Sequence, residues 1–349
     1  MESIAEVDVP HGLPNRKVEV RALHTPPKTP NHLFALHNLM AFVGNCGSGK
    51  TNALVSLVRE YLNHNTFTRV FVISPTFASN DVWQALPEID QHLREGKENE
   101  TEISKLLESY MERKEGGGKK EEKESEEFLQ ASDVYTDSMQ AQAAIQDILD
   151  KIEDERDLWR ASVAYSNAYR KWLKHRKDEL ALSPVEQGLL RNMQFEPPEV
   201  LLKPVPLLII DDQSHTDLFQ QSPRNPFINL CLRHRHIHEV GLTIMICVQN
   251  YRTGIPKCLR QNIRTFFIFA TKDRTQTDAV LEEVGNIVDK DTFYRLYGMA
   301  IQGSDHDFLT IDMHPPATNT DLKRAIRFRK NFDTWLIASS TIRDLAERK

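Results

Sequence analysis

Short apolar runs recur along the chain and predict the strands of a single buried sheet. Continuous apolar character over a few residues is typical of parallel strands that helices cover on both faces. Segments with helical apolar spacing separate several runs, as in Ile145, Ile148, Leu149 and Ile152. The alternation predicts an α/β fold with a mostly parallel central sheet. The runs lie at 39–43, 69–76, 133–136, 205–213, 242–248, 265–270 and 307–312.

Two segments interrupt this pattern and carry mostly charged residues. The first, at about 91–130, is rich in Glu and Lys and contains three consecutive glycines, so we expect a flexible, solvated insertion. The second, at 153–203, has helical spacing, and we expect a helical hairpin that packs on the core. Stacking of its aromatic residues on nucleic-acid bases is the alternative. These aromatic residues are Trp159, Tyr165, Tyr169 and Trp172.

The first apolar run opens into a glycine-rich turn, which is followed by a segment with helical spacing. In this context glycines let consecutive backbone N–H groups point toward phosphate groups, and the helix N-terminus adds its dipole. Lys50 would contact the β- and γ-phosphates of ATP, and the Thr51 hydroxyl would ligate Mg²⁺. A glycine-rich turn with an incidental lysine is the alternative. The predicted phosphate-binding residues are Gly44, Asn45, Cys46, Gly47, Ser48, Gly49, Lys50 and Thr51.

Polar residues end two later apolar runs at positions suited to the same site. Asp211 and Asp212 end a strand-like run, and ligands of open α/β sheets bind beyond the carboxyl ends of the strands. We expect Asp211 to hold Mg²⁺, directly or through water, and Asp212 to orient or deprotonate the attacking water. Gln249, after the run at 242–248, is expected to sense the γ-phosphate or the lytic water. Solvated acids and a turn-capping glutamine are the alternatives.

Cationic residues near the later strands supply the remaining catalytic candidates. Arg260 and Arg264 precede the run at 265–270, and an arginine that reaches the γ-phosphate, in cis or from a neighbouring subunit, contributes strongly to phosphoryl transfer. Each could equally form a surface salt bridge. The stretch 233–238 alternates Arg with His, which predicts either a basic loop facing the phosphate of a nucleotide or nucleic acid, or a helix C-terminus whose cations complement the dipole. Zinc is disfavoured there, because near-adjacent histidines lack a fourth ligand.

Composition indicates the cellular compartment of the protein more clearly than it indicates the binding partners. The net charge of −6 does not exclude a polyanion, because basic residues can line one surface. The four cysteines show no metal-binding spacing, which suits a reducing compartment. No apolar run approaches the roughly 18 residues that a membrane span needs, and the N-terminus does not resemble a signal peptide. We therefore expect a soluble, intracellular protein with no membrane partner.

The order of these motifs resembles that of viral genome-packaging ATPases. The chain is similar to the branch found in poxviruses, other large eukaryotic DNA viruses and polinton-type elements, within the FtsK–HerA superfamily of DNA pumps. Many members of the wider superfamily carry Asp-Glu where this chain has Asp211-Asp212. The resemblance covers roughly 35–90, 130–152 and 203–313. It rests on 44–51, Ser74-Pro75-Thr76, Asp211-Asp212, Arg233-His234, Gln249-Asn250-Tyr251, Ile255-Pro256, Leu259-Arg260-Gln261-Asn262 and 307–312.

This resemblance implies a P-loop NTPase three-layer sandwich with charged helical insertions. It also implies a homo-oligomeric ring that threads double-stranded DNA into a preformed capsid, with ATP hydrolysed between neighbouring subunits. Capsid or portal-like vertex proteins are then further partners, and the implied location is the cytoplasm or nucleus of a host cell at virus assembly sites, or the virion. The expected organisation is an extended lead at 1–34, the ATPase domain at 35–313 and a basic helix at 314–349.

Two other functions fit the same residues. A helicase or other nucleic-acid remodelling ATPase would share the nucleotide site, and strand displacement would identify it. A nucleotide-dependent assembly or scaffold protein would bind ATP without hydrolysing it, which Asp212 and Gln249 argue against. The basic cluster at 323–330 either contacts a polyanion or belongs to a surface helix that pairs with acidic neighbours.

Overall fold

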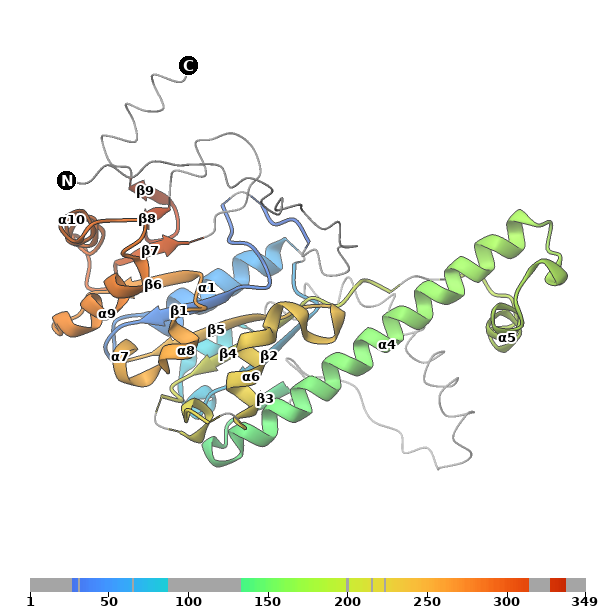
Figure 1. Ribbon diagram of the computed structural model, residues 1–349, viewed down its shortest axis with the longest axis horizontal. Helices are drawn as coiled ribbons and strands as arrows, with labels where there is room; N and C mark the ends of the chain where they lie inside the picture. Colours follow the sequence, from blue (N-terminus) through green and yellow to red (C-terminus); the bar gives the residue numbers. More distant parts are fainter. Residues whose placement is uncertain are drawn as a thin grey trace, which may run out of the picture.

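The computed structural model describes residues 27–30, 32–64, 66–86, 133–198, 201–214, 216–222, 224–313 and 327–336. Within these residues, nine strands form one sheet in the order β3-β2-β4-β5-β1-β6-β7-β8-β9 (Figure 1). Pairings from β3 to β6 are parallel, and those from β6 to β9 are antiparallel. The predicted α/β fold with a mostly parallel central sheet is confirmed. The strands are β1 Leu39–Val43, β2 Arg69–Ile73, β3 Val134–Tyr135, β4 Pro206–Asp211, β5 Thr243–Val248, β6 Thr265–Phe269, β7 Phe308–Asp312, β8 Phe328–Lys330 and β9 Thr334–Leu336.

Helices connect the strands and differ widely in length. The α-helices are α1 Lys50–Asn63, α4 Ala141–Lys174, α5 Pro184–Asn192, α6 Pro226–Arg233, α7 Tyr251–Gly254, α8 Lys257–Arg260, α9 Arg274–Val284 and α10 Lys290–Ala300. Short 3₁₀ helices are η1 Phe77–Ser79, η2 Asp81–Ala85, η4 Ser138–Gln140, η5 Glu179–Ala181, η6 Asp217–Phe219 and η7 His234–Glu239. In the part of the chain described above, no helix is both long and apolar enough to cross a membrane.

The sheet is the middle of three layers, with helices on both faces (Figure 1). Alternate side chains of β1 divide between two core clusters, because successive strand residues point to opposite faces. Ala41 and Val43 join the cluster that α4, α6, α9 and α10 cover, whereas Met40 and Phe42 join the cluster covered by α1. Both faces of β1 are therefore buried, which explains its unbroken apolar sequence.

The strand order fixes which residues meet at each edge of the sheet. β1 lies between β5 and β6, and Val43 pairs with Val248 and Ile268. β4 lies on the far side of β5, with Asp211 opposite Cys247. The ends of β1, β4 and β5 therefore converge at one edge, here called the carboxyl edge. Residues that precede these strands lie at the amino edge, about 15 Å away for a five-residue strand.

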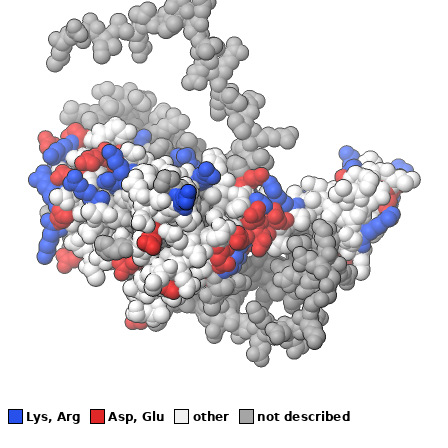
Figure 2. All heavy atoms as spheres, turned by 60° about the horizontal axis from the view of Figure 1, so that its bottom comes forward, with Lys and Arg blue, Asp and Glu red and all other residues white. Residues whose placement is uncertain are grey.

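Helix α4 is one unbroken helix of 34 residues that belongs to the core and to the second insertion at once. Ile145, Ile148 and Ile152 pack on the sheet, whereas the second half projects from the body with α5 near its tip (Figure 1). We call residues 153–198 the helical arm. Figure 2 shows acidic side chains gathered where this arm joins the body.

The helical arm has a small core of its own. Tyr165, Ala168, Leu182 and Leu190 are buried together and separately from both main clusters, with Tyr169 and Trp172 packed against them. The predicted hairpin is present, but its expected packing on the core is wrong. From Tyr165 onward, the buried side chains of α4 pack against Leu182 and Leu190 within the arm.

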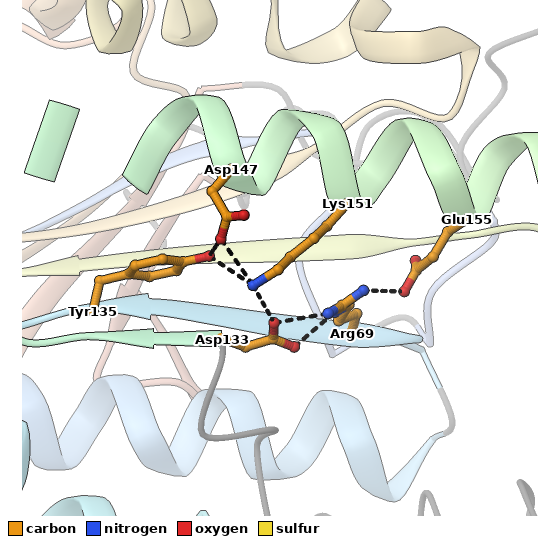
Figure 3. Close-up of polar contacts among 6 residues, drawn as sticks. All are labelled: Arg69, Asp133, Tyr135, Asp147, Lys151 and Glu155. Atoms are coloured by element: carbon orange, nitrogen blue, oxygen red, sulfur yellow. Dashed lines mark hydrogen bonds and ion pairs between the residues drawn. The ribbon is translucent and has the colours of Figure 1, made fainter. Parts of the chain in front are cut away.

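A cluster of charged side chains attaches α4 to β2 and β3, the two outermost strands on one side of the sheet (Figure 3). Arg69, at the start of β2, donates to both carboxylate oxygens of Asp133 at 2.6 and 2.8 Å and to Glu155 of α4 at 2.9 Å. Lys151 of α4 donates to Asp133 at 3.3 Å and to the Tyr135 hydroxyl at 3.0 Å. Because Asp133 is nearly buried, these partners compensate for the loss of its hydration. The cluster holds α4 in one register on β3.

The predicted basic helix at the C-terminus is wrong for residues 327–336, which form β8 and β9. Arg329 is buried, donates to the His32 carbonyl oxygen at 2.8 Å and lies over the Phe34 ring. Lys330 pairs with Asp307 at 2.8 Å. Strand alternation turns Arg329 inward, so these cations serve the fold. The rest of 314–349, residues 1–26 of the lead and the insertion at about 91–130 lie outside the described residues.

Candidate nucleotide-binding site

The phosphate loop, residues 44–51, leaves the carboxyl end of β1 in a conformation that requires glycine. Gly47 and Gly49 have φ angles of 76° and 91°, in the left-handed region that favours glycine. A Cβ atom at Gly44 would lie 2.6 Å from the Cβ of Phe269 and 2.7 Å from the Ser48 hydroxyl. The loop backbone can therefore approach β6 closely only with glycine at position 44.

Helix α1 begins at Lys50 and presents an N-terminus suited to an anion. Gly49 provides no side-chain cap, and the first turn contains no acidic residue. The first backbone N–H groups of a helix have no partner within it, so they can donate to phosphate oxygens. The Lys50 ammonium donates to the Asn45 carbonyl oxygen at 2.8 Å, so it lies across the loop. Its positive charge adds to that of the helix dipole.

Thr51 and Asp211 lie together beside this loop. The Thr51 hydroxyl donates to the Asp211 carboxylate at 3.3 Å. Burial raises the pKa of Asp211 to about 6, and the charge of Asp212 acts in the same direction, whereas Lys50 and the Thr51 hydrogen bond oppose it. Hydroxyl and carboxylate oxygens beside bound phosphates are the ligands that Mg²⁺ prefers. The donor pair therefore fits Mg²⁺, and the buried carboxyl group lies where a cation would offset its desolvation.

Asp212 and Gln249 form a second pair at the carboxyl edge. Asp212 follows β4 with a φ of 55°, Gln249 follows β5, and both side chains are exposed. The Gln249 amide donates to the Asp212 carboxylate at 3.1 Å. This hydrogen bond orients the carboxylate and leaves its other oxygen available to accept from a water molecule. The structure thus brings four sequence-predicted residues together near the loop: Thr51, Asp211, Asp212 and Gln249.

Arg260 and Arg264 lie at the amino edge, away from the phosphate loop of their own chain. Arg264 directly precedes β6, and its backbone N–H donates to the Leu39 carbonyl oxygen at the start of β1. Together with Arg235 and Glu283, the two arginines line a cavity of about 300 Å³. Burial lowers the pKa of Arg264, and the nearby charge of Arg235 lowers it further. The length of β6 separates Arg264 from the loop, so a contribution of Arg264 in cis is not supported. Arg260 lies on α8, with its guanidinium 5.7 Å from the ring centroid of Tyr251, and its role stays a prediction.

The basic stretch at 233–238 also lies at the amino edge, away from the phosphate loop of its own chain. Arg233 stands in the last turn of α6, which agrees with the alternative of a helix C-terminus. His234 is buried, with Nδ1 2.6 Å from the Cys231 carbonyl oxygen and Nε2 3.1 Å from the His37 carbonyl oxygen. Burial lowers the pKa of His234 to about 4, although the hydrogen bonds to the Cys231 and His37 carbonyl oxygens act in the opposite direction. This histidine joins the end of α6 to the segment that leads into β1.

One residue at the loop was missed from the sequence. His306 precedes β7, and its ring packs against Gly49, where a Cβ atom would lie 3.2 Å from Nδ1. The exposed imidazole stands beside the first helical N–H groups of α1. The antiparallel pairing of β7 with β6 brings the chain back to the carboxyl edge, and no local pattern around His306 signals this return.

Three solved structures illustrate what the chain is similar to. The genome packaging NTPase B204 of Sulfolobus turreted icosahedral virus 2, in complex with ATP-gammaS, is 11% identical, with 86% of this chain and 98% of that chain covered and a TM-score of 0.37. EssC (ATPases 2 and 3) of Geobacillus thermodenitrificans is 10% identical, with 70% and 34% covered and a TM-score of 0.35. The pCW3 conjugation coupling protein TcpA is 11% identical, with 90% and 66% covered and a TM-score of 0.38.

No protein-family model matches the chain, and no curated protein matches it.

Proposed function

We propose that the chain is a Mg²⁺-dependent ATPase that moves double-stranded DNA. One observation carries the ATPase part of the proposal: the phosphate loop, the Thr51–Asp211 pair and the Gln249–Asp212 pair lie together at the carboxyl edge. A protein that only binds ATP needs the loop and a metal ligand. The second pair has a purpose only where a water molecule is to be oriented for attack.

The residues divide the work of phosphoryl transfer among themselves. The loop N–H groups and Lys50 bind the β- and γ-phosphates and hold the γ-phosphorus in place for attack. Thr51 and Asp211 would hold Mg²⁺, which neutralises charge on the phosphate oxygens when bound. Asp212 accepts a hydrogen bond from the attacking water and takes its proton as the new P–O bond forms, while the bond from the γ-phosphorus to the β,γ-bridging oxygen breaks and ADP leaves with that oxygen. Gln249 positions the Asp212 carboxylate through the hydrogen bond at 3.1 Å.

We further propose that the arginines act between subunits of a homo-oligomeric ring. Arg264 lies a strand length from the loop of its own chain, and Arg260 lines the same cavity. An arginine at the γ-phosphate contributes about 10³- to 10⁵-fold to such reactions. A neighbour whose amino edge faced this carboxyl edge would supply these arginines. Each nucleotide site would then be complete only in the assembled ring.

The substrate and setting of the proposed motor follow from the sequence motifs. Their order resembles that of viral genome-packaging ATPases of the poxvirus-like and polinton-type branch. We propose that the ring moves duplex DNA into a preformed capsid, with capsid or portal-like vertex proteins as partners. The location would be a virus assembly site in the host cell, or the virion itself.

Steady-state ATP hydrolysis with and without duplex DNA tests this function. We expect the rate to rise with DNA and the stimulation to fall steeply with salt, because phosphate contacts release counterions. A rate that ignores DNA at every salt concentration would contradict the motor. The Lys50→Ala variant is the background control for contaminating ATPases.

Two further measurements separate the motor from its alternatives. A helicase would displace one strand of a duplex during hydrolysis, whereas a packaging motor would leave the strands paired. A scaffold protein would bind ATP and show no turnover above the Lys50→Ala background. Movement along intact duplex, observed on single DNA molecules, is the result expected for the motor.

A further inference from the structure

A group of three side chains lies outside the nucleotide site, where the N-terminal segment crosses helix α1. His32 comes from that segment, and Glu60 and His64 come from the end of α1. Glu60 and His64 are four residues apart, so they share one face of the helix. Each of the three residues offers one ligand atom, and these atoms all lie within 4.8 Å of one another.

The two nitrogen–oxygen separations are close to those between neighbouring ligands of a metal ion. Nε2 of His32 lies 3.0 Å from Oε1 of Glu60, and Nε2 of His64 lies 3.4 Å from the same oxygen. Ligands at about 2.1 Å from a tetrahedral zinc ion stand about 3.4 Å apart. Both imidazole rings therefore already point the correct nitrogen toward a common position beside the carboxylate.

The backbone around His32 is held firmly in place. Leu33 and Phe34 are buried in the cluster covered by α1. The Tyr61 hydroxyl donates to the Phe34 carbonyl oxygen at 2.9 Å, and Arg329 donates to the His32 carbonyl oxygen at 2.8 Å. A ligand whose backbone is fixed in advance loses little conformational freedom on binding a metal. The third ligand is thus delivered to the helix by contacts that do not depend on any ion.

We infer that His32, Glu60 and His64 form a binding site for a divalent transition metal of the zinc class. Two imidazoles and one carboxylate suit zinc, and they disfavour Mg²⁺ and Ca²⁺, which prefer oxygen ligands alone. The side chains are partly exposed, so water can complete the coordination shell. A bound ion would clip the N-terminal segment to the helix that carries the phosphate loop.

Calorimetric titration of zinc into the tag-free, EDTA-treated, nucleotide-free protein tests the site. We expect one zinc ion bound per chain by these residues. The His32→Ala/His64→Ala double variant should lose at least about 100-fold in affinity, since even partners outside the metal's own ligands contribute about 10- to 100-fold. Glu60→Gln should weaken binding while preserving the shape of the site. His175→Ala removes an exposed histidine elsewhere and should bind like the wild type.

Two further measurements test whether zinc binds at these three residues and not elsewhere on the protein. Zinc should raise the melting temperature of the wild type and of His175→Ala but leave the double variant unchanged. Cobalt bound to the wild type should show visible absorption without a thiolate charge-transfer band, because the site contains no cysteine. Equal zinc affinity in the wild type and a folded double variant would overturn the inference, as would no zinc binding by the wild type. Either result would identify the cluster as a His–Glu ion-pair network and would leave the proposed ATPase untouched.

Discussion

At the carboxyl edge of the sheet, Thr51 contacts Asp211 and Gln249 contacts Asp212, whereas at the amino edge Arg260 and Arg264 surround a cavity with Arg235. The two edges belong to the same strands and lie about one strand length apart. The residues at the carboxyl edge contact one another within a chain, whereas Arg264 at the amino edge could join them only from another chain. The contacts of the nucleotide site are thus made within one subunit, whereas a contribution from the amino edge would require a neighbouring subunit.

The largest effect is expected at the carboxyl edge itself. Lys50→Ala removes the charge that contacts the phosphates, so we expect ATP binding to be lost and turnover to fall by at least about 1,000-fold. Fluorescent-nucleotide binding and a phosphate-release assay measure the two quantities. Lys174→Ala, at the end of α4, is the matched control and should retain both. Wild-type turnover in Lys50→Ala would remove the basis of the nucleotide site.

Mixing two inactive variants tests whether the edges cooperate between chains. Arg260→Ala/Arg264→Ala keeps the nucleotide site but removes the arginines, and we expect turnover to fall by about 1,000-fold with ATP binding retained. Lys50→Ala keeps the arginines. A mixture should regain hydrolysis, because some neighbouring pairs then combine an intact loop with an intact arginine edge. If both variants assemble with each other and the mixture stays inactive, the arginines do not act in trans.

The Asp212–Gln249 pair should affect the chemical step without affecting binding. We expect Asp212→Asn to bind ATP normally and to reduce turnover by about 100-fold or more, the usual range for loss of a general base. Gln249→Ala should have a smaller effect of the same kind, because it acts through Asp212. Binding and single-turnover assays separate the two contributions. Full turnover in Asp212→Asn would assign the water to another residue.

The smallest effect is expected away from both edges, in the cluster that fastens α4 to the sheet. Hydrogen bonds from Tyr135 and Lys151 lower the pKa of Asp147. Its stabilisation is therefore present above the ordinary carboxyl pKa and is lost as the pH falls through the lower folded value. Because the side chain is 52% exposed, Asp147→Asn should cost less than about 1 kcal/mol in the free energy of unfolding.

Urea denaturation at pH 7 and at acidic pH measures this difference. The gap between wild type and Asp147→Asn should narrow at the lower pH, because the wild-type carboxyl group is then protonated as well. ATP turnover at pH 7 should be unchanged, since Asp147 contacts none of the residues of the nucleotide site or of the arginine cavity. A gap that widens at low pH would contradict the assigned pairing.

The strands and the phosphate loop could be predicted because their signals are local. Apolar runs covered on both faces are continuous in sequence, and the glycines of the loop mark left-handed backbone directly. The same reasoning could have placed Arg264 correctly, since a residue that precedes a parallel strand must lie at the amino edge. The positive charge of Arg264 alone is compatible with a role in cis, because charge does not show at which end of the strand the residue lies.

Other features depend on contacts between distant segments and could not be predicted from local pattern. His306 reaches Gly49 only because β7 runs antiparallel to β6. Arg329 looked like part of a surface cluster, yet the pairing of β8 with β7 turns it inward. The length of α4 was also hidden, since its apolar spacing changes partner after Ile152 while no Gly or Pro ends the helix.

The unbroken course of α4 makes the helical arm a lever. From Arg160, whose side chain pairs with Glu239 of η7, to Lys174 the axis extends about 21 Å, at about 1.5 Å per residue. A tilt of about 5° at the base would therefore move the tip by about 2 Å. The charged cluster on β2 and β3 holds the base of α4. A small change in the tilt of the helix there would therefore produce a larger displacement at the tip of the helical arm.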